Sequence, residues 1–224
     1  MAKGRRGKSS TNKKEEVIQL DIASWTPRTS IGKRVKAGEI SNIDQILDDG
    51  IKILEPEIVD VLLPELEAET LSITPTQRST DSGRKMQFRA VLVMGDKKGH
   101  VGIGVGKSEE VKPALEYAMR DARKNMVRVR MGCGSWECKC GTAHSVPQRL
   151  AGKYGATTIT LKPAPKGLGI AANTVVRKVL SIAGLRDVWS SALGSTSNVY
   201  NTAMATVEAL DSINKRKPQP GEAI

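Results

Sequence analysis

Aromatic residues, cysteine and long apolar runs are all scarce in this chain of 224 residues. Aromatic residues make up 3% of it, with a single phenylalanine, Phe88. Modules that bind single strands by stacking bases need aromatic platforms, so this scarcity favours recognition of phosphates, shape and duplex RNA. The cysteines number three and form no disulfide framework, which favours an intracellular, cytoplasmic protein. No apolar run reaches a membrane span and no signal peptide is visible, so we expect no membrane partner.

Charge is distributed very unevenly along the chain. The formal net charge is +11, from 35 Lys and Arg against 24 Asp and Glu. Residues 39–69 hold ten acids and one lysine, a local charge of −9, so the remainder carries +20 (+11 minus −9). Solubility needs a net charge of only about 2–8 on a small domain. Basic surface on this larger scale indicates a polyanionic partner, and nucleic acid is the usual one.

The N-terminal quarter divides into two segments. Residues 1–14 form a flexible basic arm, which either contacts RNA or only aids solubility. Residues 15–66 read as an extension with short helices, one capped by Ser41 and ended by Gly50, and one begun at Pro56. Because RNA would repel its acids, we expect the extension to face a basic protein neighbour or solvent. A loose basic tail is expected at 215–224.

Residues 67–131 read as strands followed by a helix. Leu71 and Ile73 begin a strand, and residues 74–82 look like a Ser/Thr-rich loop containing Arg78. A second strand places Met86, Phe88, Ala90, Leu92 and Met94 on one face, and residues 95–99 form a turn. A helix follows over 108–127. The bases gathered towards its end either favour the helix dipole or face RNA.

Glycine alternates along the strand between that turn and the helix. Gly102, Gly104 and Gly106 share one face, which indicates that something approaches the backbone closely. The sequence GIGVGKS resembles a phosphate-binding loop, but Val101 stands where that motif requires its first glycine. Nucleotide binding is therefore disfavoured. RNA backbone and a packed neighbour both remain open as the occupant of this face.

A cysteine-rich connector at 132–144 separates a second unit at 145–214. The connector holds Cys133, Cys138, Cys140 and His144, the ligand set of a structural zinc site, although Cys138 and Cys140 are unusually close in sequence. The alternative is three reduced thiols in a loop that contacts RNA or packs at the domain junction. In the second unit, the sequence pattern predicts a strand at 156–161, a rigid basic loop at 162–169, and helices near 173–182 and 199–213.

No convincing catalytic constellation is visible. There are no paired carboxylates and no Ser/His/Asp set, and neither His100 nor His144 has an obvious orienting carboxylate. We therefore expect no enzyme and no certain cofactor, with zinc as the candidate metal. An enzyme dependent on metal or nucleotide is the competing hypothesis, and metal analysis with a hydrolysis assay would separate the two.

The stretch GRKMQFRAVLVMGDKKGHVGIGVGKSEEV at 83–111, with PAPKGLGI and GSTSNVYNTAMATVEAL further on, closely resembles small-subunit ribosomal protein five. The extension and the cysteines resemble the archaeal members of this family. The resemblance implies an α+β protein with a double-stranded-RNA-binding-like αβββα domain and an α/β domain with a left-handed βαβ crossover. It also implies a noncatalytic constituent of the small ribosomal subunit, which holds rRNA near the mRNA entrance, contacts ribosomal proteins four and eight, and influences translational accuracy.

The resemblance and the basic patches together give a set of candidate site residues. By position, residues 74–83 match the family loop that reaches towards an rRNA junction, and Gly169 and Arg177 match the interface with protein four. Asp81 and Ser82 replace a more basic, glycine-rich loop of bacterial members. The residues expected to bind rRNA are Arg5, Arg6, Arg78, Arg84, Lys85, Arg89, Lys97, Lys98, Lys107, Arg120, Arg123, Lys124, Arg128, Arg130, Arg149, Lys153 and Lys166.

Overall fold

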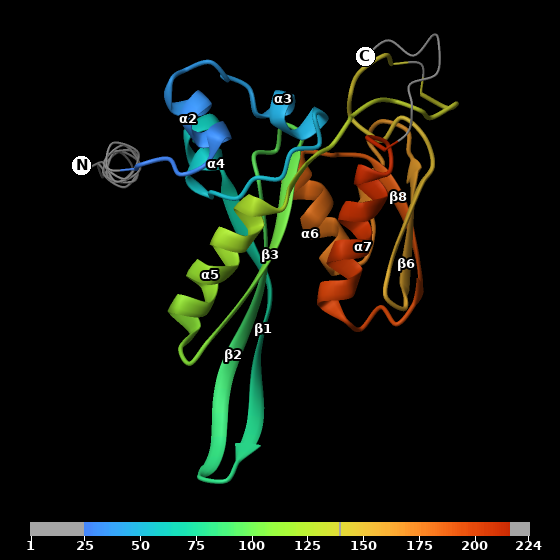
Figure 1. The fold of residues 1–224 in the computed structure, drawn as a ribbon. Helices are drawn as coiled ribbons and strands as arrows, with labels where there is room; N and C mark the ends of the chain where they lie inside the picture. Colours follow the sequence, from blue (N-terminus) through green and yellow to red (C-terminus); the bar gives the residue numbers. More distant parts are fainter. Residues whose placement is uncertain (1–24, 139, 216–224) are drawn as a thin grey trace, which may run out of the picture.

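Two sheets, each with four strands and its own helices, organise the chain (Figure 1). The structure is a computed structural model that describes residues 25–138 and 140–215. The α+β class with two domains is therefore confirmed. The predictions for the arm at 1–14, with Arg5 and Arg6, and for nearly all of the tail lie outside the described residues. Within the described part, no helix is long and apolar enough to cross a membrane.

The extension folds as three short helices around a small apolar core. The helices are α2 (Ser30–Lys36), α3 (Ile43–Asp48) and α4 (Glu57–Leu62). They bury isoleucines and valines together with Met126, which follows helix α5 (Val111–Lys124) of the first domain. The prediction that Ser41 caps the second of these helices is wrong. Asn42 occupies the N-cap position, and its side chain makes no capping hydrogen bond. Gly50 follows the helix in a left-handed conformation, φ 67°, as expected.

The first sheet has the order β1-β2-β3-β4 and is dominated by one long hairpin. Strands β1 (Glu67–Thr80) and β2 (Gly83–Gly95) pair along their whole length, with a bulge at Leu71, and project well beyond the rest of the domain (Figure 1). The predicted loop at 74–82 is therefore wrong, because all but its last two residues are strand. Pro75 is tolerated because β1 is an edge strand, and the threonines around it favour extended backbone.

Burial along the hairpin changes abruptly. Ala90, Leu92 and Met94 are buried against the main helix, as predicted. Met86 is 51% exposed, and Phe88 is half-buried, so the face that the five predicted residues share is buried only at its inner end. Among the described residues, no helix lies beneath the outer half of the hairpin (Figure 1). It is therefore a surface element that remains available to a partner.

The alternating glycines of β3 (His100–Ser108) accommodate helix α5 (Val111–Lys124). A Cβ atom placed on Gly104 would lie 1.9 Å from the Ala118 carbonyl oxygen, and one on Gly106 would lie 2.0 Å from that of Ala114. The occupant of the glycine face is thus a packed neighbour from the same chain, not RNA. On the other face, Val101 and Ile103 join a core shared with the second domain. A short strand that the sequence did not predict, β4 (Met126–Arg128), pairs with β3.

The second sheet has the order β5-β6-β8-β7 and packs against two helices. Its strands are β5 (Leu150–Tyr154), β6 (Thr157–Pro163), β7 (Ile170–Ala171) and β8 (Val188–Gly194), and its helices are α6 (Thr174–Ala183) and α7 (Val199–Asp211). Strands β7 and β8 are parallel and lie on either side of α6 in sequence, which gives a βαβ unit. Its left-handed crossover stays a prediction. The predicted ends are confirmed, since Gly184 is the C-cap of α6 and Asn198 caps α7.

Candidate RNA-binding surface and metal centre

Acidic residues of the extension and of β1 form ion pairs with lysines and arginines of the same chain. We expected the acids of the extension to face a basic protein neighbour or solvent, and the structure corrects that expectation for Asp44, Asp48, Asp60 and Glu65. The pairs within ion-pair distance are Arg123 with Asp60, Arg128 with Asp44 and Asp48, Arg130 with Asp48, Lys97 with Glu67, Lys98 with Glu65, and Lys178 with Glu69. Several bases predicted to bind rRNA are thus neutralised internally, which favours a structural role for them.

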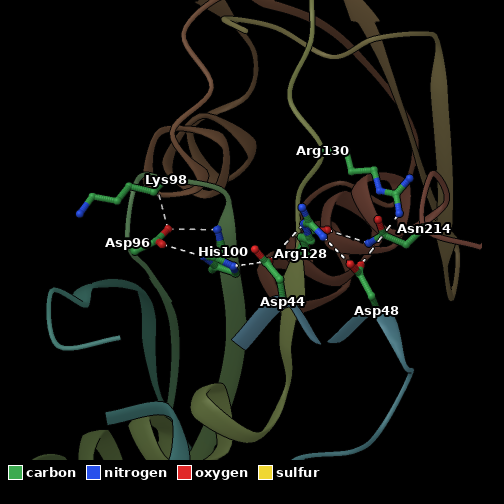
Figure 2. A network of polar contacts seen from close by, with 8 residues as sticks. All are labelled: Asp44, Asp48, Asp96, Lys98, His100, Arg128, Arg130 and Asn214. Atoms are coloured by element: carbon green, nitrogen blue, oxygen red, sulfur yellow. Dashed lines mark hydrogen bonds and ion pairs between the residues drawn. The ribbon is translucent and has the colours of Figure 1, made fainter. Parts of the chain in front are cut away.

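The closest part of this arrangement is a network around His100 and Arg128 (Figure 2). The imidazole of His100 bridges Asp96 Oδ2, 2.6 Å from Nδ1, and Asp44 Oδ1, 3.0 Å from Nε2. Burial opposes the charged ring, but hydrogen bonds to Asp96 and Asp44 raise the pKa of His100 above its usual value. Asp44 also lies 3.1 Å from Arg128 Nε. The network therefore fastens α3 to the sheet.

Asp96 shapes the turn at one end of this network. Its Oδ1 accepts hydrogen bonds from the backbone N–H groups of Lys98, at 2.8 Å, and His100, at 3.0 Å. Burial opposes ionisation, but the bond from His100 and these two amide bonds lower the pKa of Asp96. The prediction that the histidines lack orienting carboxylates is therefore wrong for His100. Asp44 could not be recognised as a partner from sequence, because it lies 56 residues from His100.

A second group of predicted bases is exposed and forms no ion pair among the described residues. Its members are Arg78, Arg84, Lys107, Arg120, Lys124, Arg149, Lys153 and Lys166. Arg78 and Arg84 lie on facing strands near the tip of the long hairpin. Lys85, directly opposite Arg78 in the pairing of the two strands, pairs with Glu109 at 3.1 Å. The exposed end of the hairpin thus offers the cations that are best placed to meet a phosphate backbone.

Arg89 differs from both groups. Its guanidinium lies 5.2 Å from the ring centroid of Tyr200 on α7, a cation–π contact between the two domains. Its Nε atom is buried and has no hydrogen-bond partner among the described residues. Arg89 was predicted to bind rRNA, and the structure places it at the domain junction.

The four predicted metal ligands lie together. Their ligand atoms, the sulfurs of Cys133, Cys138 and Cys140 and a ring nitrogen of His144, all fall within 4.8 Å of one another. The Cys133 and Cys140 sulfurs are 3.6 Å apart, and Cys138 Sγ is 3.7 Å from His144 Nε2. Tetrahedral zinc with bonds of about 2.3 Å to sulfur and about 2.0 Å to nitrogen requires separations of about 3.8 Å and about 3.5 Å. The cluster could hold a metal ion.

Local backbone structure explains how such closely spaced cysteines converge. A turn at residues 136–137 reverses the chain, and the Cys138 N–H donates to the Ser135 carbonyl at 3.3 Å. The Thr142 hydroxyl donates to Cys140 Sγ at 3.2 Å, and this bond, with a second from the Thr142 amide, lowers the pKa of Cys140 to about 5. The thiolate is the form that ligates metals.

His144 has an orienting carboxylate that the sequence analysis missed. Asp187 Oδ2 lies 2.9 Å from His144 Nδ1, and each residue is only 5% exposed. This bond leaves Nε2 to face the thiols, as in metal sites where a carboxylate fixes the histidine tautomer. Asp187 is 43 residues from His144, and no motif spacing connects the two. The second half of the prediction about orienting carboxylates is thus also wrong.

The predicted rigid loop at 162–169 is wrong at its start, because Lys162 and Pro163 belong to β6; the remainder leads into β7. Gly167 and Gly169 have positive φ angles of 93° and 78°, which explains the glycines. Lys166 is exposed at the turn, and Gly169 is the last loop residue before β7. Arg177 is exposed on α6. The loop therefore presents one of the bases that form no ion pair within the described ranges.

Comparison with known proteins places these features in a family. Residues 66–130 match the model for "Ribosomal protein S5, N-terminal domain", and residues 152–219 match that for "Ribosomal protein S5, C-terminal domain". These models describe a structural, non-enzymatic ribosomal protein, in agreement with the prediction of no enzymatic activity.

Relatives named "Small ribosomal subunit protein uS5" cover most of the chain. One from Methanocaldococcus jannaschii is 51% identical over 88% of this chain and 91% of the relative. Another from Methanoregula boonei is 48% identical over 88% and 96%, and one from Aeropyrum pernix is 49% identical over 87% and 89%. The chain therefore belongs to the ribosomal protein S5 family and is a member of its archaeal type.

Proposed function

We propose that this chain is a structural constituent of the small ribosomal subunit that binds small-subunit rRNA in the cytoplasm. The observation that best supports this proposal is the long hairpin of β1 and β2. Its exposed tip bears Arg78 and Arg84, which form no ion pair among the described residues. An antiparallel ribbon of this kind reaches beyond the domain (Figure 1) and can enter the groove or junction of folded RNA. Family membership supplies the setting in which such an element acts.

The finer parts of the proposal concern neighbours. Ribosomal proteins four and eight are the proposed protein partners, with Gly169 and Arg177 at the interface with protein four. The position near the mRNA entrance would let the chain support assembly and translational accuracy. Supporting this, Gly169 immediately precedes β7 and Arg177 lies on α6, the next element of the second domain.

Sedimentation tests this proposal. The chain should co-sediment with small subunits from a cell extract and be released as salt rises, because phosphate contacts exchange with counterions. Small subunits that retain normal decoding accuracy after losing the chain would contradict the proposed role. As a matched comparison, the double variant Arg78→Ala with Arg84→Ala should be incorporated less into small subunits. The single variant Arg34→Ala should be incorporated as well as wild type. Arg34 is an exposed base that is paired with Glu39 on the extension.

We also propose that the metal of the cysteine cluster is one structural zinc ion held by Cys133, Cys138, Cys140 and His144. Three thiolates and an imidazole make a closed set of four ligands, which is typical of structural sites. The spacings near tetrahedral values and the Asp187 carboxylate behind His144 support zinc. Zinc would contribute a fixed point for a connector that has little apolar surface to bury.

Elemental analysis tests the zinc assignment. Protein purified without chelator should contain one zinc per chain, and cobalt substitution should give the intense visible bands of tetrahedral thiolate coordination. Cys138→Ser should lose the metal, and Ser135→Ala in the same loop should keep it. Wild-type protein free of stoichiometric metal would contradict the assignment.

A further inference from the structure

Asp187 links the metal cluster to the basic loop at 162–169, and its two oxygens point to different partners. One oxygen, Oδ2, lies 2.9 Å from His144 Nδ1. The other, Oδ1, accepts hydrogen bonds from the backbone N–H groups of Gly167, at 3.0 Å, and Gly169, at 2.8 Å. Burial opposes the charged carboxylate, but these amide bonds and the bond to His144 lower the pKa of Asp187. A buried carboxylate is thus shared between two features.

Backbone contacts reinforce the same junction. The N–H groups of Arg186 and Asp187 both donate to the His144 carbonyl, at 3.0 Å and 3.2 Å. The hydroxyl of the adjacent Ser145, fully buried, accepts from the Ala164 N–H at 3.2 Å. The segment that carries the metal-ligating histidine is therefore the platform on which the loop rests.

Side-chain packing restrains the outer part of the loop only weakly. A Cβ atom placed on Gly167 or on Gly169 would meet no heavy atom within 4 Å, and Leu168 between them is 43% exposed. Two glycines in the left-handed region also leave this backbone a large choice of conformations. The two bonds to Asp187 are shorter than the two backbone bonds of the same loop, from Leu168 N–H to the Pro165 carbonyl and from Val188 N–H to the Gly169 carbonyl, both 3.3 Å.

We propose that metal binding at the cysteine cluster holds the basic loop in its binding conformation, with Asp187 as the positioning residue between them. This inference rests on the proposed zinc site. Metal on Nε2 forces the imidazole proton onto Nδ1, where it donates to Asp187. Without metal, that tautomer would be held by Asp187 alone, so the ring could turn more easily and its bond to Oδ2 would weaken. The carboxylate that anchors the loop presenting Lys166 would then be held less firmly.

Hydrogen exchange on the full-length chain tests this coupling. In zinc-loaded protein, the amides of Gly167 and Gly169 should be protected, and removal of zinc by a chelator should accelerate their exchange by about tenfold or more. Amides in the middle of β6, such as that of Ile159, should not change and serve as the internal control. Zinc removed with no change at Gly167 and Gly169 would overturn the coupling while leaving the zinc site intact.

Asp187→Asn gives a second, independent readout. The asparagine can still offer one oxygen to the glycine amides, but its NH2 group then meets the Nδ1–H of His144. Zinc affinity should fall by about 10- to 100-fold, which is typical when such a supporting carboxylate is changed, and Asp211→Asn on the surface of α7 should leave it unchanged. Wild-type affinity in Asp187→Asn would overturn the positioning role. Wild-type chain that binds no zinc would overturn the metal assignment and the coupling with it.

Discussion

The guanidinium of Arg128, at the end of β4, lies 2.5 Å from the carboxylate of Asp48, at the end of α3. The two residues are 80 apart in sequence, and Arg128 also contacts Asp44. The Asn214 side chain meanwhile donates to the Arg128 carbonyl at 2.7 Å (Figure 2). Arg128 thus ties together the extension, the first sheet and the end of the second domain.

Arg128→Gln should loosen the extension without changing RNA binding. The variant removes two partly exposed ion pairs, so the free energy of unfolding should fall by about 1 kcal/mol, since such pairs are screened by solvent. Limited proteolysis within residues 39–66 should become faster. Lys124→Gln, a nearby base with no ion pair in the described part of the chain, is the control for the loss of charge. Unchanged stability together with weakened rRNA binding would show that Arg128 contacts RNA after all.

Stability should depend on pH through His100. Because the pKa of His100 is raised in the folded state, its protonated form stabilises the fold. This contribution is fully present below the unfolded pKa of about 6.5 and is lost as pH rises through the folded pKa. Asp96 acts in the opposite sense, since its lowered pKa gives stability that is lost only in acid.

Urea unfolding of wild type and His100→Gln over a range of pH measures this effect. The difference in unfolding free energy between the two should be largest near pH 6 and should shrink at alkaline pH. His144 is present in both proteins, so its titration cancels. A difference that grows as pH rises would contradict the assigned sign.

Gly104→Ala should be severely destabilising. The added methyl would lie 1.9 Å from the Ala118 carbonyl oxygen and 2.4 Å from the Ala122 nitrogen, so α5 would have to move off the sheet. Overpacking of this kind costs about 1–3 kcal/mol or more. Gly38→Ala, which has open space but a φ of 78°, is the control and should cost only about 1 kcal/mol. Equal losses in the two variants, measured by thermal unfolding, would contradict the close packing of α5.

Much of the fold could be predicted from sequence because local residue patterns indicate where its strands, helices and turns lie. The turn at 95–99, the glycine strand, the main helix and the cap at Gly184 all depend on residues close together in the chain. The hairpin tip was misread because Pro75 and a run of serines and threonines are typical of loops, whereas pairing with β2 keeps them extended. The short strands β4, β5, β7 and β8 lack a strong apolar alternation and form only once the sheets assemble.

The candidate sites were less predictable because they depend on contacts between distant residues. The composition of the cysteine cluster indicated a metal, but Asp187 carries no local signal. Likewise, the sequence around Lys97, Lys98, Arg123, Arg128 and Arg130 predicts an RNA surface. In the structure, acids from residues 44–67 pair with these bases. The sequence shows how many basic residues the chain has, but only the fold shows which of them are paired with acids of the same chain.

The salt dependence of binding to small-subunit rRNA is the sharpest test of the hairpin tip as the RNA contact. Wild-type chain should bind with an affinity that falls steeply as salt rises, and replacing both Arg78 and Arg84 by alanine should weaken binding and reduce the slope of log K against log salt by about 1–2. Lys97→Ala with Lys98→Ala, whose side chains pair with Glu67 and Glu65, should leave the slope nearly unchanged. An unchanged slope in the hairpin variant, or a larger loss in the Lys97 and Lys98 variant, would contradict the account.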